Sequence, residues 1–164
     1  HGDHLDANAI KMLKKESTKI FLTKVCKEKL GEGQIISNGD KKMFKGISIT
    51  AVPAYNIVSK RSNGNPYHPK GEGNGYVLKL GDKQVYIAGD TENVPEMKSL
   101  KNMDIAFLPM NMPYTMTPVM VADAAKALKP IILYPYHFGK TNTEELIDLL
   151  KDEKGVDVRI RKME

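Results

Sequence analysis

The sequence opens with His1-Gly2-Asp3-His4, and the pattern of an amphipathic helix follows over residues 6–16. A turn directly before a helix can direct two imidazoles and a carboxylate at one point, because its backbone follows neither a helical nor a strand period. Neutral imidazole and carboxylate are the usual ligands of zinc and similar ions. The motif alone is a weak indication, but the other two histidines, His68 and His137, both lie in loop-like stretches beside proline or glycine.

Length and composition describe a single globular domain over residues 1–164, large enough to bury a core. Hydrophobic residues make up 41% of the chain and charged residues 27%, and no apolar run approaches the length of a membrane span. The net charge of +5 comes mainly from scattered lysines. With three arginines and no tryptophan, the chain lacks the basic and aromatic surface that is typical of nucleic-acid binding. A single cysteine, Cys26, excludes an internal disulfide, and we expect it to be buried.

Strands alternate with helices along the chain, which predicts an α/β layered architecture. Strands are expected over residues 18–23, 34–37, 42–45, 47–52, 75–80, 84–88, 104–109, 131–136 and 156–160. Helices are expected over residues 6–16, around Cys26, over residues 94–100, from a Thr117 cap to Leu128, and after a Thr143 cap. The longest irregular stretch, residues 53–74, contains His68, and loops of this length are usually functional or disordered.

Several ligand-type residues are expected at one edge of the predicted sheet. Asp90 and His137 each follow an apolar strand directly, and the first two histidines lie just before a helix. Because α/β proteins collect site residues at strand ends, these groups can converge, with His68 added from the long loop. Four histidines and two aspartates could hold two metal ions, with one carboxylate bridging them. Two cations about 3.5–4 Å apart activate a water for the hydrolysis of an ester, lactone, amide or phosphodiester.

A structural explanation is open for each candidate as well. His68, in a loop rich in proline and glycine, could simply be exposed to solvent, and His137 could be half-buried and bonded to the backbone. Gly89-Asp90-Thr91 could be a turn with a local side-chain hydrogen bond. Tyr114 and Thr115 could pack within their own loop or contact a substrate.

The ordered series of motifs resembles the metallo-β-lactamase superfamily of dinuclear metallohydrolases. His1-Gly2-Asp3-His4 is similar to the end of the family's His-x-His-x-Asp-His motif, Gly89-Asp90-Thr91 to its bridging-aspartate motif, and Tyr136-His137-Phe138-Gly139 to its final histidine motif. Residues 52–56, 68–71 and 108–116 resemble the branch that contains the ascorbate-6-phosphate lactonases. The resemblance covers nearly the whole chain and implies a four-layer αββα sandwich.

The resemblance also implies a role for each candidate ligand. One metal ion would be bound by His1 and His68, with a further histidine that would precede position 1. The second would be bound by Asp3, His4 and His137. Asp90 would bridge the two ions. We expect zinc, although manganese or iron also suits these ligands.

Three further assignments follow from the resemblance. Asp3 is the carboxylate that would orient the attacking water, and Thr91 would orient a ligating carboxylate. The family's central histidine often follows Pro-Ala-x directly. Asn56 stands at that point here, so the central role passes either to His68, twelve residues later, or to Asn56 itself.

These observations predict a metal-dependent hydrolase for a small ester, lactone or phosphate-bearing substrate, whose specificity is set by residues 55–74 and 110–116. One alternative is a binding or assembly subunit, or an incomplete piece of the fold, without catalysis of its own. A nuclease of the same superfamily is another. Because the family's N-terminal strands are not among these residues, we expect an N-terminal segment or a partner chain to complete the fold. A homo-oligomer is a further possibility. We expect a cytoplasmic protein, with no membrane or nucleic-acid partner.

Overall fold

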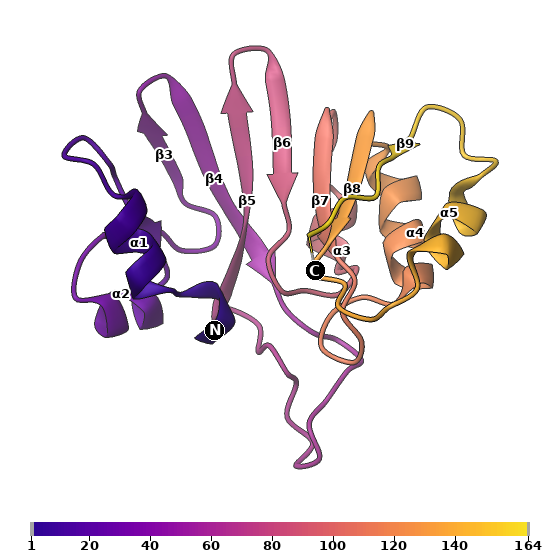
Figure 1. Cartoon of the computed structure of the whole chain (residues 1–164), viewed down its shortest axis with the longest axis horizontal. Coiled ribbons are helices and arrows are strands. Elements are labelled where there is room, and N and C mark those ends of the chain that lie inside the picture. The colour runs from indigo at the N-terminus through magenta and orange to yellow at the C-terminus, as the bar shows by residue number, and fades with distance from the viewer. Residues whose placement is uncertain (1, 164) are drawn as a thin grey trace.

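A computed structural model describes residues 2–163 as one large mixed sheet with helices against one face and a small helical and two-stranded unit beside the other (Figure 1). The elements, in chain order, are η1 (Gly2–His4), α1 (Ala7–Leu13), β1 (Phe21–Leu22), α2 (Lys24–Leu30), β2 (Gln34–Ile35), β3 (Lys41–Phe44), β4 (Ile47–Ala54), β5 (Gly73–Leu80), β6 (Lys83–Ile87), α3 (Pro95–Lys98), β7 (Ile105–Pro109), α4 (Pro118–Leu128), β8 (Ile132–Tyr136), α5 (Thr143–Leu150) and β9 (Asp157–Val158). This arrangement confirms the predicted α/β class.

The large sheet joins an antiparallel half to a parallel half. Its strand order is β3-β4-β5-β6-β7-β8-β9, and β1 pairs with β2 in a separate parallel ribbon. Strands β3 to β6 pair antiparallel, whereas β6 to β9 pair parallel and are joined through α3, α4 and α5. As a result β4, β6, β7 and β8 all end at the same edge. Figure 1 shows the long loop between β4 and β5 extending beyond that edge.

The hydrophobic core lies between the sheet and helices α3 to α5. Alternate positions of β7 and β8 point into it, because successive side chains of a strand face opposite sides of the sheet. The core is built from fully or almost fully buried residues of strands and helices, among them Ala106, Leu108, Leu133, Val121, Leu128 and Leu146. This packing fixes the register of the strands whose ends form the site.

The opposite face of β7 and β8 carries large apolar side chains that are only partly buried in the described structure. Phe107 and Tyr134 stack at 5.1 Å between ring centroids, and Tyr136 contacts the Phe107 ring edge-on. A continuous apolar run such as that of β7 is typical of a strand that is buried on both faces. Within residues 2–163, only the face toward α4 and α5 is completely covered.

Most element positions agree with the sequence, and the differences have local causes. The expected strand over residues 18–23 shortens to two residues because it pairs only with the two-residue β2. Asn142, rather than Thr143, caps α5, because its side-chain oxygen accepts from the Glu144 N–H. Cys26 is half-buried, not buried. None of the helices between residues 2 and 163 combines the length and apolar character needed to cross a bilayer.

Candidate metal centre

Asp90 lies at the centre of the site, in the turn that follows β6. Its side chain is only 3% exposed, and three imidazoles surround its carboxylate. Oδ1 lies 3.2 Å from Nε2 of His4 and 3.7 Å from Nε2 of His137. Oδ2 lies 3.3 Å from Nε2 of His68. The two oxygens therefore face different histidines, as the oxygens of a carboxylate between two cations would.

Gly89 allows this turn to form close against β5. Its φ of +68° lies in the left-handed region, which glycine adopts without steric cost. A Cβ atom at this position would lie 2.5 Å from the backbone oxygen of Asn74. Glycine is thus required both by the conformation of the turn and by the approach of the neighbouring strand.

Charge and burial act in opposite directions on the site's titratable groups. Burial by itself raises the pKa of Asp90, but the hydrogen bond from His4 and the charges of the three imidazoles when protonated hold that pKa below its ordinary value. The hydrogen bond to Asp90 raises the pKa of His4. Burial lowers the pKa of His68, and the charge of Arg61 acts in the same direction. Asp90 is therefore ionised and His68 neutral at neutral pH, the states in which both groups bind metals.

His137 reaches the site through an unusual backbone conformation directly after β8. Its φ is +48°, and its N–H donates to the Met163 carbonyl at 2.7 Å. Its ring meets the ring of His4 edge-on at 5.3 Å, and its Nε2 lies 3.6 Å from Oδ2 of Asp3. The C-terminal segment thus holds a strained residue whose side chain points into the site.

The N-terminal 3-10 turn supplies the exposed side of the centre. The Asp3 side chain is 59% exposed, and its Oδ2 lies 3.7 Å from Nε2 of His4. Ligand atoms of Asp3, His4, Asp90 and His137 all lie within 4.8 Å of one another. Together with His68 on Oδ2 of Asp90, the structure assembles five of the six predicted ligands. The sixth, His1, lies outside the described residues.

The structure distinguishes between the two residues considered for the central ligand. His68 is 7% exposed, and its ring lies against Asp90. Asn56 faces away from that cluster: its Oδ1 accepts from the His68 N–H at 2.8 Å, and its Nδ2 donates to the Tyr114 carbonyl at 2.9 Å. Of the two, His68 is therefore the residue whose ring lies with the other candidate ligands, and Asn56 bonds the backbone that carries it.

Glu92 is a site residue that the sequence did not reveal. It is fully buried two positions after Asp90, and its carboxylate accepts from the backbone N–H groups of Ile57, Val58 and Ser59. Burial raises the pKa of Glu92, but these hydrogen bonds outweigh it and hold the pKa below the ordinary value. Only the position of Glu92 next to Gly89-Asp90-Thr91 could have drawn attention to it.

The contacts of Thr91, Tyr114 and Thr115 lie mostly outside the cluster around Asp90. The Thr91 hydroxyl bonds the backbone N–H and carbonyl of Tyr55, so it supports the end of β4 rather than a ligating carboxylate. Thr115 is fully buried, and its hydroxyl bonds the backbone of Asn111, which favours loop packing over substrate contact. Tyr114 is 45% exposed, and its ring packs edge-on against Tyr67.

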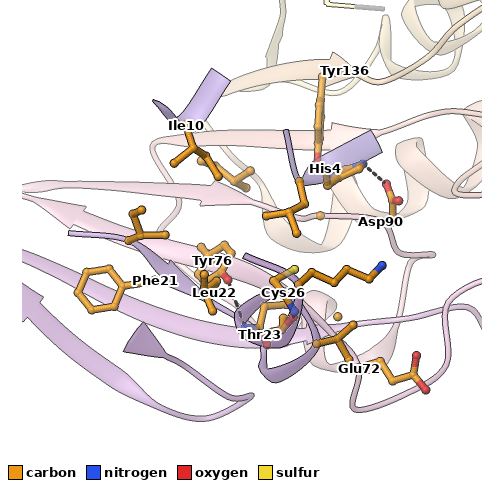
Figure 2. A pocket seen from close by; sticks show the side chains of 18 residues that line it. His4, Ile10, Phe21, Leu22, Thr23, Cys26, Glu72, Tyr76, Asp90 and Tyr136 are labelled. Carbon is orange, nitrogen blue, oxygen red and sulfur yellow. Dashed lines mark hydrogen bonds and ion pairs between the residues drawn. The ribbon is translucent and has the colours of Figure 1, made fainter. Parts of the chain in front are cut away.

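A cavity of about 410 Å³ extends from the centre between the N-terminal elements and the sheet. Figure 2 shows His4 paired with Asp90 at one side, with Tyr136 above them and Tyr76 and Cys26 deeper along the wall. Most of the other lining residues are apolar, including Ile10, Phe21 and Leu22. The ligand set thus lies at the border of an apolar space and not on a flat surface.

The arrangement fits a divalent metal on the chemistry of its donors. Imidazole nitrogens and carboxylate oxygens suit zinc, manganese and iron, and the buried Asp90 carboxylate presents an oxygen to each group of histidines. A site with these donors beside an open cavity can bind a metal and still admit a substrate.

Comparison with known proteins places these features in context. A beta-lactamase superfamily domain model matches residues 1–137. A UPF0173 metal-dependent hydrolase of Thermococcus onnurineus is 30% identical over an alignment of 172 positions, which covers 95% of this chain and 73% of that protein. The chain spans 64–66% of the length of three other curated relatives with the same description.

Solved structures agree in fold. A crystal structure from Parabacteroides distasonis, of a protein provisionally assigned as a metal-dependent hydrolase, is 50% identical and superposes with a TM-score of 0.93. The match covers all of this chain and 73% of that one. YhfI of Bacillus subtilis, a metallo-beta-lactamase fold protein, is 16% identical with a TM-score of 0.75, over 99% of this chain and 72% of that one. The similarity to YhfI concerns the fold alone.

Proposed function

Since the chain belongs to the metallo-β-lactamase superfamily, and within it to the UPF0173 family of metal-dependent hydrolases, we propose that the whole protein hydrolyses a small ester, lactone or phosphate-bearing substrate. The observation that carries the proposal is the division of the Asp90 carboxylate between two groups of histidines. The fold is the metallo-β-lactamase fold that the sequence predicts.

We propose two metal ions, for which zinc is the first candidate. His68 and Oδ2 of Asp90 would hold one ion, and Oδ1 of Asp90 would hold the other with Asp3, His4 and His137. Such ions polarise the bond to be cleaved and lower the pKa of a bound water. Asp90, enclosed by histidines, keeps the two groups of ligands together.

Asp3 is the group that we propose to orient the attacking water and accept its proton. It is the most exposed carboxylate of the centre, at 59%, whereas Asp90 is buried among three imidazoles. A general base must lie within hydrogen-bond reach of the water that it deprotonates. Of the two carboxylates in the described cluster, Asp3 is the one that is open to solvent.

A phosphate-bearing or otherwise anionic substrate is favoured by the loop around His68. The Arg61 guanidinium lies 5.1 Å from the centroid of the Tyr67 ring, which in turn packs against the half-exposed Tyr114. A guanidinium over a half-buried aromatic ring, with a second and exposed ring beside it, suits a planar or phosphorylated small molecule. The loop motifs that resemble the ascorbate-6-phosphate lactonases also favour a phosphate-bearing substrate. The cytoplasmic location of the protein stays a prediction.

Metal analysis of the whole protein tests this proposal directly. Mass spectrometry of the metals is expected to find about two equivalents per chain. Chelation is expected to abolish hydrolysis in a panel of lactones, carboxylic esters and phosphodiesters, and zinc or manganese should restore it. Restoration by one ion only would identify the working metal. A protein that binds no transition metal after reconstitution, or hydrolysis that survives chelation, would contradict the proposal.

The partly buried face of the large sheet bears on how the whole protein is completed. We propose that strands of the same protein, outside these 164 residues, lie over the stacked Phe107 and Tyr134 rings. Two observations support this: the curated relatives are longer than the chain, and the side chains on this face of β7 and β8 are only partly buried. Burial of such a face is the usual way in which sheet proteins complete a core.

Tyrosine nitration of the whole protein tests this covering. Tyr134 is expected to resist tetranitromethane, whereas the half-exposed Tyr114 should react and serves as the internal control. Peptide mass spectrometry gives both extents of modification. Equal reaction of the two tyrosines would show that the face is open, and the proposed covering would then be wrong.

A further inference from the structure

Glu92 and Asn56 connect the turn that carries Asp90 to the loop that carries His68. Glu92 follows Asp90 by two residues, and its carboxylate is surrounded by donors from the other segment. Oε2 accepts from the N–H groups of Ile57 and Val58, each at 2.7 Å, and Oε1 accepts from Ser59 at 2.8 Å. Three successive backbone N–H groups form a cradle for one anion.

Asn56 extends the connection to His68. Its side-chain amide donates to Oε1 of Glu92 at 3.3 Å and to the Tyr114 carbonyl at 2.9 Å. Two further hydrogen bonds join Asn56 to His68. The His68 N–H donates to Oδ1 of Asn56 at 2.8 Å, and the backbone N–H of Asn56 donates to the His68 carbonyl at 2.9 Å. Asn56 is 5% exposed and Glu92 fully buried, so water does not compete for these bonds.

The position of the loop depends on this network for a simple reason. Residues 55–72 leave the sheet at the end of β4 and return at the start of β5, and Figure 1 shows that they extend away from both strands. His68 nevertheless has to lie within 3.3 Å of a carboxylate on the β6 turn. The buried Thr91 hydroxyl bonds the start of the loop at Tyr55, whereas the Glu92 carboxylate and the Asn56 amide bond the residues that follow it and His68 itself.

We propose that Glu92 and Asn56 are positioning residues that fix His68 opposite Oδ2 of Asp90, and so set the affinity of one of the two metal positions. The metal part of this inference rests on the proposed function, whereas the loop part does not. Asp3, His4 and His137 belong to other segments, so the second metal position is expected to be independent of the network.

Glu92→Gln in the whole protein tests the inference with two measurements. The amide group replaces one acceptor oxygen by a donor, so amide exchange at Ile57, Val58 and Ser59 is expected to rise at least about tenfold. In zinc titration calorimetry, one equivalent should weaken by about 10- to 100-fold while the other keeps its affinity. If Glu92 had a purely structural role, its replacement would lower the unfolding temperature but would not weaken the zinc affinity of one metal position more than that of the other.

Glu96→Gln is the matched control. Glu96 also bonds the loop, but through the side chains of Lys70 and Tyr55 rather than through its backbone. Its replacement is expected to leave both amide exchange at residues 57–59 and zinc affinity within about twofold of the unmodified protein. Asn56→Ala is the second variant, in case Glu92→Gln does not fold, and it should cause the same selective loss of one zinc equivalent.

The outcomes separate the two proposals. The positioning role is overturned by unchanged amide exchange at residues 57–59 in a folded Glu92→Gln protein, or at His68 in a folded Asn56→Ala protein. An equal loss of both zinc equivalents overturns it as well. If the unmodified protein binds no zinc, the proposed function fails. Amide exchange then still decides whether Glu92 holds the loop, since that measurement needs no metal.

Discussion

Asp90→Asn is expected to leave the whole protein folded but to remove most of its bound metal and lower kcat/KM by at least about 100-fold. The amide keeps the shape of the side chain but not its charge, and only one of its two positions can still coordinate a cation. Replacements in the shell around a metal ligand already cost about 10- to 100-fold, so a residue that faces three histidines should cost more. Metal content and steady-state kinetics measure the two effects separately.

Asp82→Asn provides the comparison for this variant. Asp82 lies in the turn between β5 and β6, its side chain is 87% exposed, and its described charged neighbour is Lys83 at 3.7 Å. Its replacement changes the net charge by the same amount as Asp90→Asn but should alter neither metal content nor turnover. If Asp90→Asn kept about two metals and full activity, the bridging role would have to be abandoned.

Gly89→Ala is the second change with a large expected effect, and it acts through the backbone. The new Cβ would meet the Asn74 carbonyl oxygen at 2.5 Å, and this oxygen belongs to a paired strand that cannot turn aside. The residue would also have to hold a φ of +68°. We expect the free energy of unfolding to fall by more than about 3 kcal/mol, with a loss of metal because Asp90 is the next residue.

Gly81→Ala separates the cost of the positive φ from the cost of the clash with the Asn74 carbonyl. Gly81 has nearly the same φ, +64°, but a Cβ there would meet no atom within 4 Å. It should therefore show the cost of the left-handed conformation alone, about 1–2 kcal/mol. Urea unfolding of both variants in the presence of a chelator gives the comparison without a metal contribution. Equal losses would show that β5 adjusts to the new Cβ and that the close approach is unimportant.

The sequence predicted the strand ends of the site well, for a physical reason. Asp90 and His137 follow apolar runs whose period and length identify strands, and strands that run in one direction end at one edge. The local rules for helix starts placed α4 correctly, with Thr117 as its cap and Pro118 as its first residue. The alternating pattern of strands and helices was enough for the α/β class.

Contacts between distant segments could not be predicted in the same way. Nothing in the local pattern around Glu92 shows that its carboxylate accepts from residues 57–59, which lie more than thirty positions earlier. The burial of Thr115 likewise depends on how its loop closes on Asn111. Where the His68 ring lies is decided by the same tertiary contacts, so the sequence alone left it between ligand and exposed loop residue.

The position of β6 between the two halves of the sheet has a consequence for how the protein folds. The hairpins β3–β4 and β5–β6 close through two-residue turns, whereas β4 and β5 are joined by the long loop that carries His68, and β7 to β9 are added through helical crossovers. Long connections of either kind cost more chain entropy to close than the two turns do. His68 comes from the first half, His137 from the end of the second, and Asp90 from the strand that joins them. The metal centre is therefore complete only when both halves have docked. Metal binding then stabilises the finished fold over every partly folded state, and its onset during refolding would mark the last assembly step.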